Sequence, residues 1–98
     1  MPGAGARPLE WLPAARRAFD GTLERIAGED PESAELVRVR AEHAFETVRR
    51  YPGIGTQAPK RGERRFAVPR TGHVFHYRLV RGAIRIVLWY RARRDIVR

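Results

Sequence analysis

Two stretches with the apolar spacing of an amphipathic helix follow each other in residues 12–51, with only a short connection between them. Each repeats apolar side chains every three or four positions, which predicts one buried stripe per helix. Because a connection this short makes successive helices pack antiparallel, the segment predicts a helical hairpin. The two stripes are Leu12, Ala15, Phe19, Leu23 and Ile26, and Ala34, Val37, Ala41, Ala44, Val48 and Tyr51.

Start and stop signals support both helices. Pro13 suits the first turn of a helix, where a missing N–H costs nothing, and Gly28 ends the first stretch. Asp30 precedes a second proline and predicts the cap of the second helix. Leu36 and Val39 lie off the second stripe, so they either widen the buried face or form an exposed patch for a partner.

Period-two alternation replaces the helical spacing in the second half of the chain. Residues 65–68, 74–80 and 83–90 predict three strands joined by tight turns, and residues 7–12 predict a short strand before the helices. The order strand, helix, helix, three strands predicts an α+β fold of two layers. We expect the N-terminal strand to join three antiparallel strands in one sheet that packs on the two helices.

Strict alternation assigns the two faces of this sheet. It places Leu88 and Tyr90 on the face toward the helices and Trp89 on the opposite face. That opposite face carries arginines, whose planar forks suit phosphate or carboxylate, beside an indole that offers a stacking plane. It is interpreted either as an anion-binding site or as an ordinary solvated polar face. The candidate anion-binding residues are Arg65, Arg78, Arg85, Trp89 and Arg91.

Charge is divided unevenly along the 98 residues. The net charge is +9, from 20 basic and 11 acidic residues. Residues 1–50 hold 8 Arg and 9 acids, while residues 51–98 hold 12 basic residues and 2 acids. The second half therefore indicates an anionic partner, either nucleic acid or an acidic protein segment. Length and composition predict a single domain over 1–98, with a flexible start at 1–6 and a basic tail at 92–98.

Few residues offer covalent or metal chemistry. The chain has no cysteine, and Ser33 is its only serine, which argues against a hydrolase triad. His43 and Glu46 have helical spacing but no evident third ligand, so we expect no metal and no cofactor. Odd spacing puts His73 and His76 on opposite faces of one strand. Among the possible proton carriers, which also include Lys60 and Tyr90, no converging pair is evident. The sequence contains no run of about 18 apolar residues, so we expect no membrane-spanning helix.

Several short motifs, taken in order, resemble the RelE/ParE toxin superfamily of type II toxin–antitoxin systems. They are LEWLPAA at 9–15, YPGIG at 51–55, RRF at 64–66, HYR at 76–78 and VLWYRARRD at 87–95. The resemblance covers about residues 7–95. It implies a small cytoplasmic toxin that a cognate antitoxin neutralises. The antitoxin contacts that we expect are Leu36, Val39, Arg78, Arg85 and Trp89.

The superfamily has two functional branches. RelE-like members cleave ribosome-bound mRNA without metal, using basic residues on the strands and a tyrosine after the last strand, whereas ParE-like members poison DNA gyrase. In this sequence Ala67 and Val74 are apolar where the nucleases tend to be basic, and no tyrosine follows Tyr90. The resemblance is therefore closer to ParE, and we expect a toxin that binds gyrase through its basic residues and catalyses no reaction. That target-binding set adds Arg93 and Arg94 to the sheet residues above.

Two alternatives stay open at this stage. One is a RelE-like endoribonuclease that acts on ribosome-bound mRNA. Its catalytic residues would be Arg65, His76, Arg78 and Arg93. The other is a nucleic-acid-binding domain without catalysis, whose affinity would fall steeply with salt.

Overall fold

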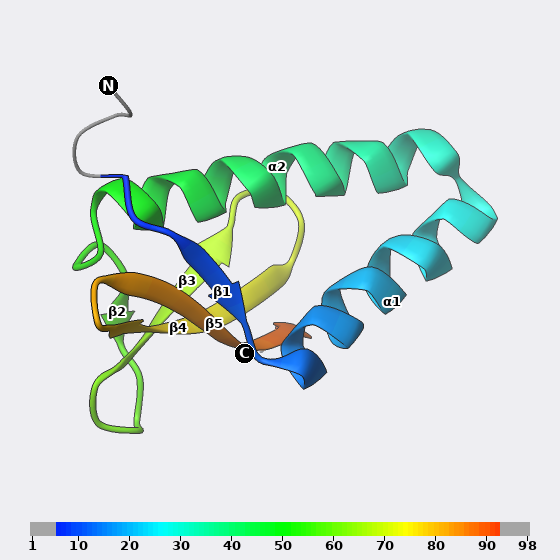
Figure 1. Ribbon diagram of the computed structural model, residues 1–98. Helices are drawn as coiled ribbons and strands as arrows, with labels where there is room; N and C mark the ends of the chain where they lie inside the picture. Colours follow the sequence, from blue (N-terminus) through cyan, green and yellow to red (C-terminus); the bar gives the residue numbers. More distant parts are fainter. Residues whose placement is uncertain (1–5, 93–98) are drawn as a thin grey trace, which may run out of the picture.

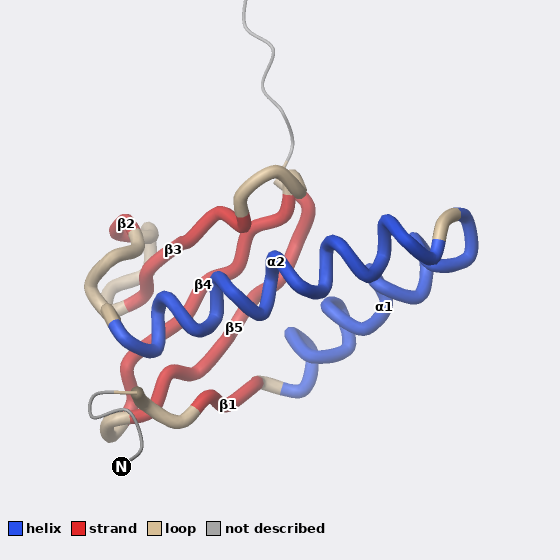
Figure 2. Tube along the Cα trace, turned by 90° about the horizontal axis from the view of Figure 1, so that it is seen from above, coloured by secondary structure: helices blue, strands red, loops and turns tan. Residues whose placement is uncertain are grey.

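The predicted helical hairpin is present in the computed structural model, which describes residues 6–92. Helix α1 spans Pro13–Glu29 and helix α2 spans Pro31–Arg50, and the two run antiparallel (Figure 1). The Asp30 carboxylate caps α2 by accepting hydrogen bonds from the Ser33 hydroxyl at 2.7 Å and the Glu32 amide at 3.2 Å. Both hydrogen bonds lower the pKa of Asp30, and the bond from Ser33 has the larger effect. The far end of the hairpin extends past the sheet (Figure 2).

Five strands form one mixed sheet in the order β1-β5-β4-β3-β2. The three antiparallel strands β3, β4 and β5 confirm the expectation from alternation, and β1 joins them by pairing parallel to β5. Strand β2, only two residues long, was not expected and pairs antiparallel with β3. The bounds are β1 (Leu9–Trp11), β2 (Thr56–Gln57), β3 (Glu63–Val68), β4 (His73–Val80) and β5 (Ala83–Arg91).

Strand β1 starts directly after a proline, which is possible because β1 lies at the edge of the sheet. Pro8 has no N–H to give, but its carbonyl accepts a hydrogen bond from the Ile84 amide at 2.8 Å. Directly after the strand, the Leu12 amide donates a hydrogen bond to the Ile86 carbonyl at 2.9 Å. These bonds place the start of α1 beside β5.

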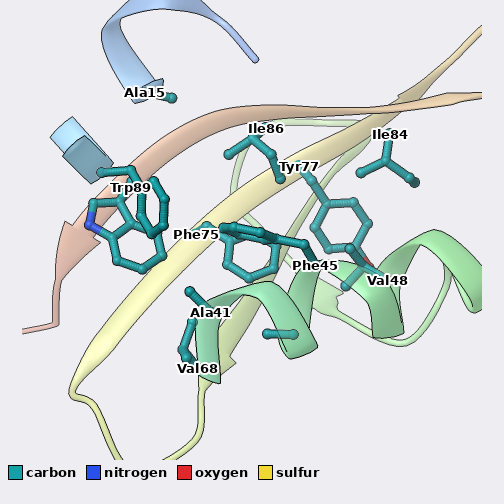
Figure 3. Packing of buried hydrophobic residues seen from close by; sticks show 12 residues of the cluster. Ala15, Ala41, Phe45, Val48, Val68, Phe75, Tyr77, Ile84, Ile86 and Trp89 are labelled. Carbon is teal, nitrogen blue, oxygen red and sulfur yellow. The ribbon is translucent and has the colours of Figure 1, made fainter. Parts of the chain in front are cut away.

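An aromatic cluster fills the space between the helices and one face of the sheet (Figure 3). The ring of Phe19 lies 4.7 Å from that of Trp89, and Phe45 lies 5.0 Å from Phe75, both at steep interplanar angles. Such edge-to-face pairs stabilise a core beyond the area that they bury. The middle residues of both predicted stripes are buried or partly buried, but Leu12 and Tyr51 are exposed because α1 begins after Leu12 and α2 ends before Tyr51.

Strand β5 does not alternate along its whole length, and this overturns one expectation. Tyr77 pairs with Ile86 and His76 pairs with Leu88, so Val87 is an extra residue without a partner. A bulge of this kind reverses the faces of all residues after it. Trp89 is therefore only 4% exposed, inside the core, while Leu88 and Tyr90 are 46% and 37% exposed on the opposite face.

The predicted placement of Trp89 on the arginine-bearing face is thus wrong, as is that of Leu88 and Tyr90 toward the helices. The core suits the indole because its polar N–H finds a partner there. Trp89 Nε1 donates to the Thr22 hydroxyl at 3.0 Å, and that hydroxyl donates to the Ala18 carbonyl at 3.1 Å. A buried indole without such a partner would cost about 1–3 kcal/mol.

Candidate functional site on the outer face of the sheet

Three of the predicted arginines share the sheet face that points away from the helices, which we call the outer face. Directly paired residues on neighbouring strands project to the same side. Arg65 pairs with His76, and Arg78 pairs with Arg85, across β3, β4 and β5. Arg65 is exposed, and the other two are partly buried. The expected cluster of arginines therefore exists for these three residues.

The three arginines differ in how far their charge is balanced. Arg85 Nε lies 3.1 Å from the Glu10 carboxylate, in a cross-strand ion pair between β5 and β1. Within residues 6–92, Arg65 and Arg78 make no salt bridge. These two guanidinium groups are the ones available to an incoming phosphate or carboxylate.

Arg91 and the tail do not complete this cluster as predicted. The bulge puts Arg91 on the same side as Trp89, where its charge, after burial, helps to lower the pKa of His73. Arg93 and Arg94 lie outside the described residues. Trp89 and Arg91 were both expected on the outer face, but both lie on the opposite face of the sheet.

A hydrogen-bonded network of three side chains crosses the outer face and was not predicted. His76 Nδ1 lies 2.7 Å from the Glu63 carboxylate, and His76 Nε2 lies 2.8 Å from the Tyr90 hydroxyl. Glu63 pairs with Arg78 and Tyr90 pairs with Val74, so both are diagonal neighbours of His76, one on each side. Diagonal neighbours are within reach of long side chains in antiparallel sheets. We call Glu63, His76 and Tyr90 the outer-face triad.

Hydrogen-bond chemistry fixes the direction of the triad when its carboxylate is ionised and its imidazole neutral. A carboxylate only accepts, so His76 Nδ1 carries the proton and donates it to Glu63. The other ring nitrogen is then an acceptor, and the Tyr90 hydroxyl donates to it. His76 and Glu63 are both buried, so Tyr90 is the member of the triad that faces solvent.

Sequence reasoning missed this convergence because it depends on the bulge. With strict alternation Tyr90 points toward the helices and cannot meet His76. One extra residue at Val87 moves the phenol to the outer face and moves the indole of Trp89 into the core. Local alternation carried no signal for it, because Leu88, Trp89 and Tyr90 are each acceptable in a core. The expected separation of His73 and His76 is confirmed, since His73 stacks on Trp89 inside the core.

The predicted apolar patch on α2 is exposed. Leu36 and Val39 are each 48% exposed, so they do not widen the buried stripe. Val39 also lines a shallow groove between α2 and the β3–β4 turn, together with Arg40, His43, Pro69 and Arg70. Arg40 Nη1 donates to the Arg70 carbonyl at 3.3 Å and ties the helix to this turn. The groove thus combines the apolar side chains of Val39 and Pro69 with the cationic Arg40 and Arg70.

Metal and membrane features can be stated for the described part of the chain. Within residues 6–92, no group of three or more His, Asp or Glu side chains is arranged to hold a metal ion. Over the same residues, neither helix is both long and apolar enough to cross a lipid bilayer.

Comparison with known proteins identifies the fold. No protein-family model matches the sequence, and no curated protein matches it. Among solved structures, a chain of the "Chromosomal ParDE TA system from P. aeruginosa" superposes with a TM-score of 0.78. The match covers 91% of this chain and 99% of that chain, at 17% sequence identity. The fold is that of the ParDE chain.

That likeness confirms, at the level of fold, the resemblance that the motifs indicate. The superposition covers 91% of a chain that is built from one N-terminal strand, a helical hairpin and C-terminal antiparallel strands. At this level of identity the match shows the fold alone, and the roles of the outer-face residues are argued from their own geometry.

Proposed function

We propose that the chain is the toxin of a type II toxin–antitoxin module, that it is of ParE type, and that it arrests growth in the cytoplasm by binding DNA gyrase. The observation that carries the proposal is the fold match, which spans 91% of the chain and relates it to a ParDE toxin–antitoxin system. The basic second half of the chain and the arginines of the outer face support a partner of opposite charge.

The outer face is the target-binding surface in this proposal. Arg65 and Arg78 present planar forks that are not committed to salt bridges within the described residues. Guanidinium groups of this kind pair with carboxylates or phosphates in two parallel hydrogen bonds. Binding, rather than turnover of a substrate, then produces the toxicity.

The antitoxin binds the same chain at a second surface. Leu36 and Val39 supply apolar contacts on α2, and the neighbouring groove holds the cationic Arg40 and Arg70. An antitoxin segment with apolar anchors and acidic neighbours fits this combination. Contacts to Arg78 and Arg85 extend the interface onto the outer face, while Trp89 is too buried to take part.

Expression in a bacterial host tests the toxin proposal. Induction is expected to stop growth and to raise the DNA-damage response, and co-expression of the small protein encoded next to the chain is expected to restore growth. The double variant Arg65→Ala/Arg78→Ala is expected to lose toxicity and keep its melting temperature. Arg17→Ala, an exposed arginine on α1, is the matched control and is expected to stay toxic.

Two further measurements distinguish gyrase from mRNA as the target. Purified chain is expected to trap cleaved DNA in a gyrase supercoiling assay, and primer extension is expected to find intact mRNA after induction. Codon-specific cuts in translated messages would contradict the gyrase proposal and favour the endoribonuclease. A stable, benign protein that the neighbouring gene product never binds would contradict the toxin proposal itself.

A further inference from the structure

We propose that the outer-face triad is a nucleophilic site for phosphodiesters, in which the Tyr90 hydroxyl attacks phosphorus. The proposal goes beyond the toxin function and does not rest on it. It rests on the hydrogen bonds of Glu63, His76 and Tyr90, on their burial and on the arginines beside them.

The triad has the connectivity that activates a hydroxyl nucleophile. Such a site needs a hydroxyl within hydrogen-bond reach of a base, and a third group that orients the base. The Tyr90 hydroxyl lies 2.8 Å from His76 Nε2, and His76 Nδ1 lies 2.7 Å from Glu63. The carboxylate holds the imidazole in the tautomer whose free nitrogen faces the phenol, which is the arrangement that a general base requires.

Burial distinguishes the triad from an ordinary polar sheet face. The outer face carries no helix, yet Glu63 and His76 are 6% and 8% exposed. A buried carboxylate and a buried imidazole cost free energy that apolar side chains at the same positions would not. Tyr90, at 37% exposed, is the one member that a ligand can reach. The base and its orienting group are thus shielded from water behind the nucleophile.

The surrounding charges select the substrate. Arg65 pairs directly with His76 across β3 and β4, and Arg78 pairs directly with Glu63. Both arginines therefore lie next to the triad on the same face. They can neutralise the non-bridging oxygens of a phosphodiester and the charge that builds on them in the transition state. A neutral ester carries no charge for this pair to bind before the reaction, whereas a phosphodiester is already an anion, so the geometry favours a phosphodiester.

The reaction is a transesterification in which no oxidant, reductant or metal takes part. As the Tyr90 oxygen forms a bond to phosphorus, its proton moves to His76 Nε2, and the bond from phosphorus to the leaving oxygen breaks. His76 then gives the proton to that oxygen, which leaves as an alcohol. The product is a phosphotyrosyl diester on Tyr90. Water then attacks phosphorus, its proton moves to His76 Nε2, and the bond from phosphorus to the Tyr90 oxygen breaks. His76 returns the proton to that oxygen, which restores the phenol and releases a phosphate monoester.

Bis(4-nitrophenyl) phosphate is the probe for this site because its leaving group is coloured. The full chain is expected to release a burst of about one 4-nitrophenolate per protein, as an acyl-type covalent intermediate does. Intact mass spectrometry is expected to show the matching phosphoryl adduct, and peptide mapping is expected to place it on Tyr90. Tyr90→Phe should abolish both signals. Tyr51→Phe, an exposed tyrosine at the end of α2, should leave both unchanged.

Glu63 is a positioning residue, and its test separates positioning from folding. Glu63→Gln is expected to slow the burst at saturating probe by at least about 100-fold, because the amide no longer fixes the imidazole tautomer. Its half-saturating probe concentration and melting temperature are expected to stay unchanged. Arg65→Ala should instead raise the half-saturating concentration. A burst that Tyr90→Phe or Glu63→Gln leaves intact would overturn the proposal.

Labelled single-stranded DNA and RNA of one sequence complete the test. Because the nucleophile comes from the protein, both are expected to give a covalent protein–oligonucleotide band on a denaturing gel. Cleavage of RNA alone, without an adduct, would overturn the nucleophile assignment, since the RNA 2′-hydroxyl would then be the attacking group. Failure with all three probes, in a protein with native circular dichroism, would also overturn it.

Discussion

At the scale of single residues, Gly55 joins the loop after α2 to the sheet. Its amide donates to the Tyr77 hydroxyl at 2.9 Å, and that hydroxyl donates to the Pro52 carbonyl at 2.7 Å. A Cβ at Gly55 would lie 2.8 Å from both the Tyr77 oxygen and the Arg65 carbonyl, whereas one at Gly53 would meet nothing within 4 Å. We therefore expect Gly55→Ala to lower the free energy of unfolding by about 1–3 kcal/mol. Urea unfolding measures this, with Gly53→Ala as a control that should change by less than about 0.5 kcal/mol.

A second prediction at the scale of single residues concerns His73, which we expect to make the stability of the protein depend on pH. The ring is buried against Trp89 with neither nitrogen hydrogen-bonded within the described residues, and burial, then the charge of Arg91, lowers its pKa from 6.5. The unfolded chain therefore takes up the proton first. Stability should fall as the pH drops below about 6.5, and this loss should stop once the pH is below the folded pKa.

Urea unfolding at a series of pH values between about 8 and 5 checks this effect. His73→Phe keeps an aromatic ring against Trp89 and should flatten the part of the profile that His73 causes. His43→Gln, at an exposed site on α2, should leave the profile as it is. Equal profiles for the native chain and His73→Phe would show that the buried imidazole has no part in it.

At the scale of elements, the bulge in β5 sets both the core and the outer face. Deleting Val87 would restore strict alternation, turn Trp89 outward and bring Tyr90 toward the helices. We expect this deletion to cost about 3–5 kcal/mol of unfolding free energy, the size of losing a buried tryptophan from a core. Val87→Ala keeps the extra residue and should cost no more than about 1 kcal/mol. Similar losses for the two variants would show that the bulge does not determine the core.

The same element shows what sequence could and could not predict. Helix periodicity and a proline in the first turn of each helix determine α1 and α2 locally, so their stripes and their antiparallel pairing were predictable. The single bulge depends on whether Leu88 or Trp89 packs better against Phe19 and Phe45, which is decided across the whole core. Strand β2 was missed because two residues carry no alternation. The triad was missed because the bulge turns Tyr90 to the outer face. Arg65 and Arg78 lie on other strands and Arg85 precedes the bulge, so all three were placed correctly.

At the scale of the whole molecule, the excess positive charge lies in the second half of the chain and the exposed apolar patch of α2 lies in the first half. Residues 1–50 hold 8 Arg and 9 acids and carry the exposed Leu36 and Val39, while residues 51–98 hold 12 basic residues and 2 acids. Charged surfaces mainly govern how fast partners meet, and desolvated apolar contacts mainly govern how slowly they separate. The two halves of the chain are thus expected to control different steps of antitoxin binding.

Stopped-flow or surface-plasmon measurements of the proposed antitoxin complex can separate these two steps. Raising the salt concentration from about 50 to about 500 mM should lower the association rate constant by about 10-fold or more, since it shortens the Debye length to a few ångströms. Arg78→Ala/Arg85→Ala should weaken this salt dependence while changing the dissociation rate constant less. Leu36→Ala/Val39→Ala should raise the dissociation rate constant by about 10-fold or more and keep the salt dependence, because it removes apolar contact without changing charge. An unchanged salt dependence in the arginine variant would place the outer face outside the antitoxin's encounter surface and leave it to the toxin's target alone.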